Sequence, residues 1–434
     1  MKIGVAGLWH LGCVTAGCLA SAGYSVIGWD DDSALIERLK QGKPPVAEPG
    51  LQPLLQQNLA SGRISFTTVP TELCACDILW VTFDTPVDAN DQADVEFVVS
   101  RVANLMAHLK PGVLILVSSQ LPVGSTRRLE TLWQTTRPGI PASFACMPEN
   151  LRLGKAIEVF TRPDRVVAGV SSAADRERIA ALLKPFTETI EWMSVESAEM
   201  TKHALNAFLA TSVVFINEIA AICEHSGADA REVERGLKSD VRIGRRAYLR
   251  AGGAFAGGTL ARDIVFLQEI GSKQNLPNAL FAAVNQSNDA HKQWQRRRLQ
   301  ELFPQLRGAR ICILGLTYKP GTNTLRRSSA VELAQWLAEQ GAVISAHDPA
   351  VDSLPDELSR IIRLEKTAEA AASKTAALVV GTECPEFTTL NAADLCGWMS
   401  APVVLDAGRL LETQWGQDSR IKYIAVGKGT YPLP

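Results

Sequence analysis

The stretch KIGVAGLWHLG at residues 2–12 decides the fold of the first part of the chain. It begins as a short apolar strand, and Gly7 and Gly12 then bound a turn that leads into a long apolar segment. A second short apolar strand, Ser25–Trp29, follows and ends at Asp30. Short apolar strands separated by helical stretches are typical of a parallel sheet that is covered on both faces. The opening of the chain therefore predicts an α/β domain.

The turn from Gly7 to Gly12 stands where a dinucleotide-binding loop stands, because it follows a strand and opens a helix. Asp30 lies 18 residues after Gly12, where a carboxylate can accept a hydrogen bond from a ribose 2′-hydroxyl and favour NAD over NADP. Trp9 replaces the middle glycine of this motif, and its indole takes space that the pyrophosphate uses unless it turns away. We expect NAD here, with reduced affinity or a shifted pose; the alternative is a plain strand-turn-helix.

A helical stretch joins this half of the chain to a second half with the same pattern. Residues 198–223 contain no glycine or proline, which predicts one long helix. The pattern restarts with a strand at 310–314, a turn at Gly315 and a strand that ends at Asp348. The fold class expected is α/β, with two Rossmann-like, doubly wound parallel-sheet domains joined by a long central helical segment. The expected domains are residues 1–196, 197–300 and 301–434.

The composition favours a soluble, cytoplasmic protein. The 434 residues carry 44 basic and 46 acidic side chains, a formal net charge of -2, which argues against nucleic acid as a partner. The nine cysteines lack the paired spacing of a zinc site and indicate free or buried thiols in a reducing compartment. No apolar run reaches the roughly 18 residues that a membrane-spanning helix needs, so we expect no membrane contact.

Many short segments together resemble the UDP-glucose/GDP-mannose dehydrogenase family, over essentially the whole chain. The agreement lies in their order as well as their content, so chance agreement is remote. In chain order the segments are PVAEPGL at 45–51, DTP at 84–86, LPVGST at 121–126, PENLRLGKAI at 148–157, PDR at 163–165, EMTK at 199–202, NAF at 206–208, FINE at 215–218, RIG at 242–244, GLTYKP at 315–320 and TECPEF at 382–387.

The resemblance implies a homodimer in which an NAD domain and a UDP domain flank a central helix. It also implies oxidation at C6 of a nucleotide-diphosphate sugar to a carboxylate, in two hydride transfers. The cofactor-binding residues so implied are Gly7, Trp9, Leu11, Gly12, Asp30, Thr85 and Pro86. The substrate-binding residues so implied are Glu149, Leu151, Arg152, Arg242, Phe255, Gly257, Lys319 and Arg326. For the cations among them, the alternative is ordinary surface charge.

Lys202 and Asn206 are spaced i, i+4 and so lie on one face of the predicted long helix. An ammonium and an amide that project together can stabilise an alkoxide at C6, which is the role that the resemblance implies for these positions. The alternative is a polar stripe that only faces solvent. Because the surrounding helix is mostly apolar, we favour the functional interpretation.

The loop GGAFAGGTLARD at residues 252–263 aligns without gaps with the family's G-x-G-x-G-G-S-C-x-P-K-D. Thr259 stands where the resemblance places the nucleophilic cysteine. A threonine hydroxyl is a poor nucleophile toward an aldehyde unless a strong base adjoins it, because its pKa lies far above that of a thiol. Asp263, which by the same resemblance helps to orient the catalytic water, is retained.

Two further positions depart from the family pattern. Leu153 stands in place of the carboxylate that activates the hydrolytic water, and Gln120 in place of a threonine that helps to bind the C6 region. The step from aldehyde to acid therefore loses its nucleophile and its base together. A thiol of Cys146 or Cys223 within bonding reach of the sugar C6 would overturn this expectation.

Three functions fit these observations. The first is an NAD-dependent oxidoreductase of the UDP-glucose 6-dehydrogenase type, which does not use the full four-electron thioester route. The second is a catalytically inactive sugar-nucleotide-binding or regulatory paralogue, which Trp9, Thr259, Leu153 and Gln120 motivate. The third is a different NAD-assisted reaction, such as epimerisation through transient oxidation. We favour the first, because the architecture and half of the site persist.

Overall fold

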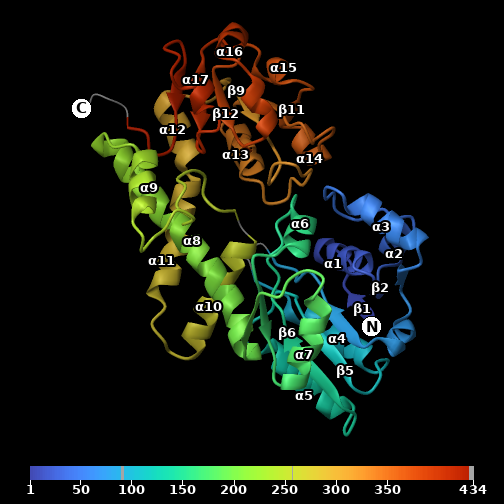
Figure 1. The fold of residues 1–434 in the computed structure, drawn as a ribbon. Helices are drawn as coiled ribbons and strands as arrows, with labels where there is room; N and C mark the ends of the chain where they lie inside the picture. Colours follow the sequence, from blue (N-terminus) through green and yellow to red (C-terminus); the bar gives the residue numbers. More distant parts are fainter. Residues whose placement is uncertain (89–91, 257, 430–434) are drawn as a thin grey trace. The chain divides into compact units, whose positions relative to one another are not determined.

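The computed structural model describes residues 1–88, 92–256 and 258–429 (Figure 1). The chain divides into two compact units, Met1–Leu205 and Asn206–Pro434, and the long helix α8 (Val195–Ser226) carries the boundary between them. Each unit contains one sheet built from short apolar strands. The predicted fold class, two Rossmann-like sheets with a long central helix, is confirmed.

The sheet of the first unit has eight strands in the order β3-β2-β1-β4-β5-β6-β7-β8. The order reverses between β1 and β4, which is the switch point at which doubly wound folds bind their ligands. The strands are β1 (Lys2–Ala6), β2 (Ser25–Trp29), β3 (Ile64–Thr67), β4 (Ile78–Val81), β5 (Val113–Val117), β6 (Ala142–Cys146), β7 (Val166–Gly169) and β8 (Ile190–Met193).

Helices cover both faces of this sheet. Alternate residues of each strand therefore pack into two different hydrophobic cores. In β4, Ile78 and Trp80 pack into one hydrophobic cluster, and Leu79 and Val81 pack into another. Both faces are apolar, and so the strands appear in the sequence as continuous apolar runs. The helices are α1 (His10–Ser21), α2 (Ser33–Lys40), α3 (Leu51–Ala60), η1 (Pro70–Ala75), α4 (Val95–Met106), α5 (Ser125–Thr136), α6 (Ala156–Thr161) and α7 (Ala173–Leu183).

One pair of strands departs from the expected parallel arrangement. β6 and β7 pair antiparallel, through Cys146 and Gly169, whereas β7 and β8 are parallel again. Gly169 permits this route because a Cβ there would lie 2.7 Å from the Cα of Val195, where α8 begins. The antiparallel step thus brings the end of this sheet directly against the start of the long helix.

The sheet of the second unit repeats the first, in the order β11-β10-β9-β12-β13-β14. Its strand pairs are all parallel, and its switch point lies between β9 and β12. The elements of this half are β9 (Arg310–Leu314), α13 (Ser329–Glu339), β10 (Val343–His347), α14 (Asp356–Ser359), β11 (Ile362–Leu364), α15 (Ala368–Ala372), β12 (Ala377–Val380), η2 (Pro385–Thr389), α16 (Ala392–Trp398), β13 (Val403–Asp406), α17 (Glu412–Trp415) and β14 (Lys422–Ile424).

Helices precede this sheet in the second unit. The part of α8 in this unit packs through Ala207, Ala210 and Val214 against Ile264 and Val284 of two later helices. The helices that follow α8 are α9 (Ala230–Ser239), α10 (Thr259–Lys273), α11 (Ala279–Lys292) and α12 (Trp294–Leu302), and Figure 1 shows α9, α10 and α11 along α8.

The long helix contains a longer apolar stretch than expected from the sequence. Its best window has a mean hydropathy of 1.7 and is 39% buried, so α8 is long and apolar enough to cross a membrane by length and composition. The expectation that no apolar stretch reaches that length therefore does not hold for α8. One such helix is weak support for a membrane span, because core helices of soluble proteins pass the same test.

Candidate active site

The loop between β1 and α1 has the close approaches that a dinucleotide-binding turn requires. Gly7 has a φ of +94°, and a Cβ on it would lie 2.6 Å from the backbone of Phe83. A Cβ on Gly12 would lie 1.8 Å from the carbonyl oxygen of Gly7. Any other residue at either position would push the backbone apart, so the turn explains both glycines. The amino end of α1 has no side-chain cap, which suits it to receive a phosphate.

Asp30 holds this loop in place. Its Oδ2 accepts a hydrogen bond of 2.8 Å from the Leu8 N–H, and its Oδ1 accepts one of 3.1 Å from the Asp32 N–H. Burial, the largest influence, raises the pKa of Asp30, although both N–H groups act to lower it. A carboxylate has about four lone-pair positions, so this bonding leaves capacity for a ribose hydroxyl. The sequence pattern alone does not indicate the bond to Leu8.

Trp9 occupies the N-cap position of α1 without strain. Its φ of -77° and ψ of -151° are extended values that any residue adopts, so the backbone does not need a glycine here. The side chain is 49% exposed. The turn therefore keeps its shape without the middle glycine, and only the bulk of the indole distinguishes it from the usual motif. Leu11, on the first turn of α1, is half-buried.

Thr85 and Pro86 follow β4, at the same edge of the sheet. The buried Thr85 hydroxyl donates a hydrogen bond of 2.8 Å to the carbonyl oxygen of Gln120, which joins the loops after β4 and β5. Pro86 is exposed, and its carbonyl accepts a hydrogen bond of 2.8 Å from the Asp94 N–H. Thr85 thus supports the loop that carries Gln120, and its role toward a cofactor stays a prediction.

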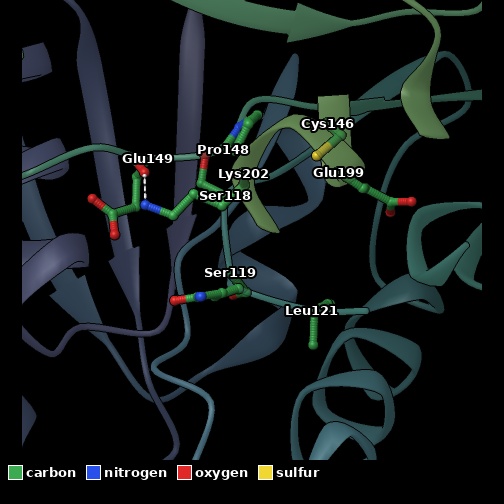
Figure 2. Close-up of a pocket in the computed structure, with 9 residues that line it drawn as sticks. Ser118, Ser119, Leu121, Cys146, Pro148, Glu149, Glu199 and Lys202 are labelled. Carbon is green, nitrogen blue, oxygen red and sulfur yellow. Dashed lines mark hydrogen bonds between the residues drawn. The ribbon is translucent and has the colours of Figure 1, made fainter. Parts of the chain in front are cut away.

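A small pocket lies beyond the carboxyl ends of β5 and β6 (Figure 2). The Lys202 ammonium enters it and donates a hydrogen bond of 2.6 Å to the carbonyl oxygen of Glu149. Because an ammonium has three donors, Lys202 can hold this carbonyl and still bind a ligand oxygen. The pocket is lined by Ser118, Ser119, Gln120, Leu121, Cys146, Pro148, Glu149, Glu199 and Lys202.

Two polar groups of this pocket were not singled out from the sequence. Ser119 is 7% exposed, and its hydroxyl has no hydrogen-bond partner within the described residues. Such a group costs about 1–3 kcal/mol unless water or a ligand satisfies it, so it marks the pocket as a place for a polar ligand. The buried Glu199 carboxylate instead accepts hydrogen bonds from the N–H groups of Gly124 (2.6 Å) and Thr126 (2.9 Å). Glu199 lies in the family-like segment EMTK at 199–202, but neither that segment nor any pattern around Ser119 indicates these contacts.

Cys146 lies in the wall of the same pocket, at the end of β6. Burial, with a smaller contribution from the nearby Glu199 carboxylate, raises the pKa of Cys146 well above its usual range. The side chain therefore remains a neutral thiol, which is a far weaker nucleophile than a thiolate. Cys223 belongs to a hydrophobic cluster of the second unit, and burial raises its pKa as well. Neither thiol has the environment of an activated cysteine.

The segment predicted to contact the substrate begins at Glu149. Its Oε2 accepts a hydrogen bond of 2.5 Å from the Leu151 N–H, which folds the chain back on itself. Leu151 and Leu153 are half-buried, and Arg152 is exposed. The structure brings Glu149 to Lys202 and leaves Arg152 open to solvent.

A buried carboxylate anchors the far end of this segment. Glu48 is 7% exposed and accepts hydrogen bonds from the N–H groups of Gly154 (2.8 Å) and Ala156 (2.9 Å). Its Oε2 also lies 2.9 Å from Nε2 of His10, the first residue of α1. Glu48 lies in the family-like segment PVAEPGL at 45–51, but the pattern alone does not indicate this anchoring contact.

In the second unit, the structure joins two of the predicted catalytic residues. The Asn206 amide donates a hydrogen bond to the Asp263 carboxylate, and the side chains are 5% and 0% exposed. Thr259 is the first residue of α10, one turn before Asp263, and it is exposed. The exposed Thr259 and the buried Asp263 thus lie about one turn apart on α10, and Asn206 of α8 pairs with Asp263.

The glycine-rich loop before α10 is pinned by two buried asparagines. Asn217 accepts a hydrogen bond of 3.0 Å from the Gly252 N–H, and Asn288 bonds to both the N–H (3.0 Å) and the carbonyl (2.8 Å) of Phe255. The Phe255 side chain packs against the cluster that α8, α10 and α11 form. Gly257, predicted to bind substrate, lies outside the described residues.

The predicted diphosphate-binding cations are at the surface. The Arg242 side chain is 85% exposed and forms an ion pair of 2.7 Å with Asp240. Lys319 and Arg326 are also exposed. Their exposure suits both a ligand contact and a solvated charge, so their role stays a prediction.

The turn after β9 repeats the geometry of the turn after β1. Gly315 has a φ of +85°, and a Cβ on it would lie 2.6 Å from the backbone nitrogen of Thr382. Asp348 accepts hydrogen bonds of 2.7 Å and 2.9 Å from the N–H groups of Leu316 and Thr317. Each sheet therefore carries a glycine turn that an aspartate after its second strand holds, as in a nucleotide-binding α/β protein of the dehydrogenase class.

The chain belongs to the UDP-glucose/GDP-mannose dehydrogenase family. Residues 1–187 match the NAD binding domain of this family, residues 196–290 its central domain and residues 312–413 its UDP binding domain. The resemblance that the sequence segments carry is thus confirmed, and so is an NAD binding domain in the first half of the chain. By family the chain is an NAD-dependent nucleotide-sugar dehydrogenase, an oxidoreductase.

Individual relatives match over the full length. The chain is 32% identical to the UDP-glucose 6-dehydrogenase of Rhizobium meliloti (strain 1021), over 99% of this chain and 100% of the relative. It is also 32% identical to UDP-glucose 6-dehydrogenase TuaD of Bacillus subtilis (strain 168), over 99% and 95%. Among solved structures, a UDP-glucose dehydrogenase from Pyrobaculum islandicum superposes with a TM-score of 0.87 at 28% identity, over 99% of this chain and 98% of that one.

Proposed function

We propose that this chain is an NAD-dependent oxidoreductase that acts at C6 of a nucleotide sugar of the UDP-glucose type, without the thioester route to the acid. The observation that carries the proposal is Thr259, which the resemblance places at the position of the nucleophilic cysteine, in a chain that matches all three domains of the family. Leu153 in place of the hydrolytic carboxylate supports it. The reaction that remains is the interconversion of alcohol and aldehyde.

The turn after β1 fits NAD. Gly7 and Gly12 leave a cradle that a Cβ would fill, α1 offers an uncapped amino end, and Asp30 can still accept a ribose hydroxyl. When bound, NAD supplies an acceptor for a hydride. The half-exposed Trp9 is then the part of the chain that limits how closely the pyrophosphate approaches.

Lys202 is the residue proposed to act on the C6 oxygen. Oxidation of the alcohol removes a hydride from C6 and a proton from its hydroxyl, so negative charge develops on that oxygen as the proton leaves. The Lys202 ammonium, held by the Glu149 carbonyl, is placed in its pocket to stabilise this charge. The Ser119 hydroxyl in the same pocket can donate a further hydrogen bond to a polar group of the ligand.

The step from aldehyde to acid has no suitable nucleophile among these residues. The Thr259 hydroxyl is exposed to solvent, and Asp263 is already engaged by Asn206. The alternative thiol, Cys146, is held neutral by its burial. An aldehyde, or its hydrate, is thus the product proposed for the native chain.

Restoring the two lost groups tests this proposal directly. The native chain, Thr259→Cys and the double variant Thr259→Cys/Leu153→Glu are each incubated with NAD and UDP-glucose. Reduced cofactor is followed by absorbance, and the protein by intact mass spectrometry. We expect aldehyde from the native chain, a covalent sugar adduct on Thr259→Cys, and acid from the double variant. Cys146→Ser is the matched control and should behave as the native chain.

Other outcomes would contradict the proposal. Acid from the native chain, with two reduced cofactors for each sugar, would show that the thioester route or an equivalent survives. Binding of NAD and UDP-glucose without any turnover, across a panel of nucleotide sugars, would favour the inactive paralogue. An epimer detected by NMR, without net reduction of NAD, would favour the third function.

We further propose that the chain forms a homodimer through α8. Phe208, Phe215 and Ile222 are 67%, 46% and 62% exposed, and they are seven residues apart, so they form an apolar stripe on one face of the helix. An exposed apolar stripe of this kind fits the same stripe of a second copy. In light scattering, Phe215→Glu should yield monomers, whereas Val241→Glu, at an exposed apolar position outside α8, should not. A native chain that is monomeric at every concentration would refute the dimer.

A further inference from the structure

Glu48 connects two segments to which the proposed function assigns different ligands. On one side it contacts His10, which follows Trp9 in the turn proposed for NAD. On the other side it holds the N–H groups of Gly154 and Ala156, at the end of the segment proposed for the sugar nucleotide. All of these residues belong to the first unit of the chain.

The contact is strong because the carboxylate is buried and its donors are fixed. The Glu48 side chain is 1% exposed, whereas that of His10 is 17% exposed. Two of the three donors are backbone N–H groups, and hydrogen bonds to a charged acceptor in a dry environment are stronger than neutral ones. A shift of the Gly154–Ala156 backbone therefore either carries Glu48 with it or breaks these bonds.

The same segment also holds the proposed catalytic lysine. Gly154 lies five residues after Glu149, whose carbonyl accepts the hydrogen bond from Lys202. The bond between Glu149 and the Leu151 N–H stiffens the chain between them. A continuous set of hydrogen bonds and short peptide segments thus runs from the first turn of α1, through Glu48, to the carbonyl that positions Lys202.

We propose that Glu48 is a positioning residue that couples the binding of NAD to the binding of the sugar nucleotide. This inference rests on the proposed function. With NAD bound in the turn after β1, the His10 side chain and, through Glu48, the segment that ends at Ala156 are restricted further. The sugar nucleotide then binds a segment that has less freedom left to lose. By thermodynamic reciprocity, the sugar nucleotide strengthens the binding of NAD by the same factor.

The test is a calorimetric cycle on the full-length chain. NAD and UDP-glucose are titrated singly and then each in the presence of the other. With the native chain each ligand should tighten the other by about tenfold, within the usual range of such couplings. In Glu48→Gln, an amide NH2 faces a backbone donor, and the coupling factor should fall to about one while each ligand alone binds within about threefold of its native affinity. Glu37→Gln, at an exposed position on α2, should leave the coupling unchanged.

Variants of His10 separate a positioning role from a merely structural one. His10→Gln keeps a side-chain donor toward Glu48 and should preserve the coupling, and His10→Phe removes the donor and should abolish it. His108→Gln, on the loop after α4, is the matched control. These variants carry the test if Glu48→Gln does not fold.

The outcomes distinguish this inference from the proposed function. Binding of both ligands to the native chain with a coupling factor of one would overturn the inference alone. A native coupling that Glu48→Gln and His10→Phe leave intact would overturn it as well. No binding of either ligand to the native chain would overturn the proposed function, and the inference with it.

Discussion

Trp9 offers the sharpest test of how this chain handles its cofactor. The indole replaces the glycine that lets a pyrophosphate approach the backbone, yet the backbone at this position needs no glycine. Substitution by alanine and then by glycine removes first the indole and then the Cβ. We expect NAD to bind more tightly at each step, because each step removes bulk from the face that the phosphates approach.

The structure sets the magnitude of both effects. A buried tryptophan removes roughly 150–250 Å² from water. Trp9 is 49% exposed, so about 100 Å² is lost on substitution, or about 2.5 kcal/mol of stability at ~25 cal/mol per Å². Recovery of one N–H hydrogen bond to a charged phosphate contributes about 1.5 kcal/mol, which is about tenfold in the dissociation constant for NAD.

Isothermal titration with NAD and urea denaturation of the same three proteins measure these two quantities. Trp9→Gly should bind NAD about tenfold more tightly than the native chain and unfold at a lower urea concentration, with Trp9→Ala between them in affinity. Weaker NAD binding by Trp9→Gly would refute the reasoning. It would show that the indole contacts the cofactor instead of obstructing it.

Three further predictions concern closely packed or buried groups and are measured by the stability of the folded chain. Gly12→Ala should lower the free energy of unfolding, measured by urea denaturation, by about 3 kcal/mol or more, because its Cβ would lie 1.8 Å from the Gly7 carbonyl oxygen. An unfolding midpoint equal to that of the native chain would contradict this close contact. Asn206→Ala should lower the free energy of unfolding by about 2 kcal/mol in the same measurement, because the buried Asp263 carboxylate loses a hydrogen-bond donor. An unchanged unfolding midpoint would mean that the pair does not form in solution. Burial lowers the pKa of His291. Below about pH 6.5 the unfolded chain therefore binds a proton at His291 before the folded chain does, and the free energy of unfolding falls as the pH falls. His291→Gln should weaken this pH dependence, and a pH profile identical to that of the native chain would contradict the role of His291.

The strands that carry the nucleotide turns could be predicted because local pattern determines them. The predicted strand 25–29 agrees with β2, and the predicted strand 310–314 agrees with β9. Each is a short apolar run that ends at a glycine or an aspartate, and burial on both faces makes such runs continuous. The predicted helix 198–223 falls within α8, which extends to Val195 and Ser226. Helix ends depend on a few capping contacts and are harder to place.

The features that sequence reasoning missed depend on contacts between distant residues. The antiparallel pairing of β6 with β7 joins Cys146 to Gly169, and no turn signal in the sequence marks that choice. The anchor at Glu48 spans 106 residues to Gly154 and 108 to Ala156. Local pattern carries no information on such pairs. The predicted substrate residues are likewise known by their positions in the sequence, and only ligand contacts can test their roles.

The aspartates that hold the two glycine turns have a consequence for how the chain tolerates substitution. Asp30 and Asp348 satisfy the N–H groups of their turns from within the protein. The backbone of each turn is thus held by contacts within the protein. A substitution away from these turns, as at Thr259 on α10, therefore leaves their supporting contacts in place. Support of the backbone and the proposed chemistry are thus carried by different residues of this chain.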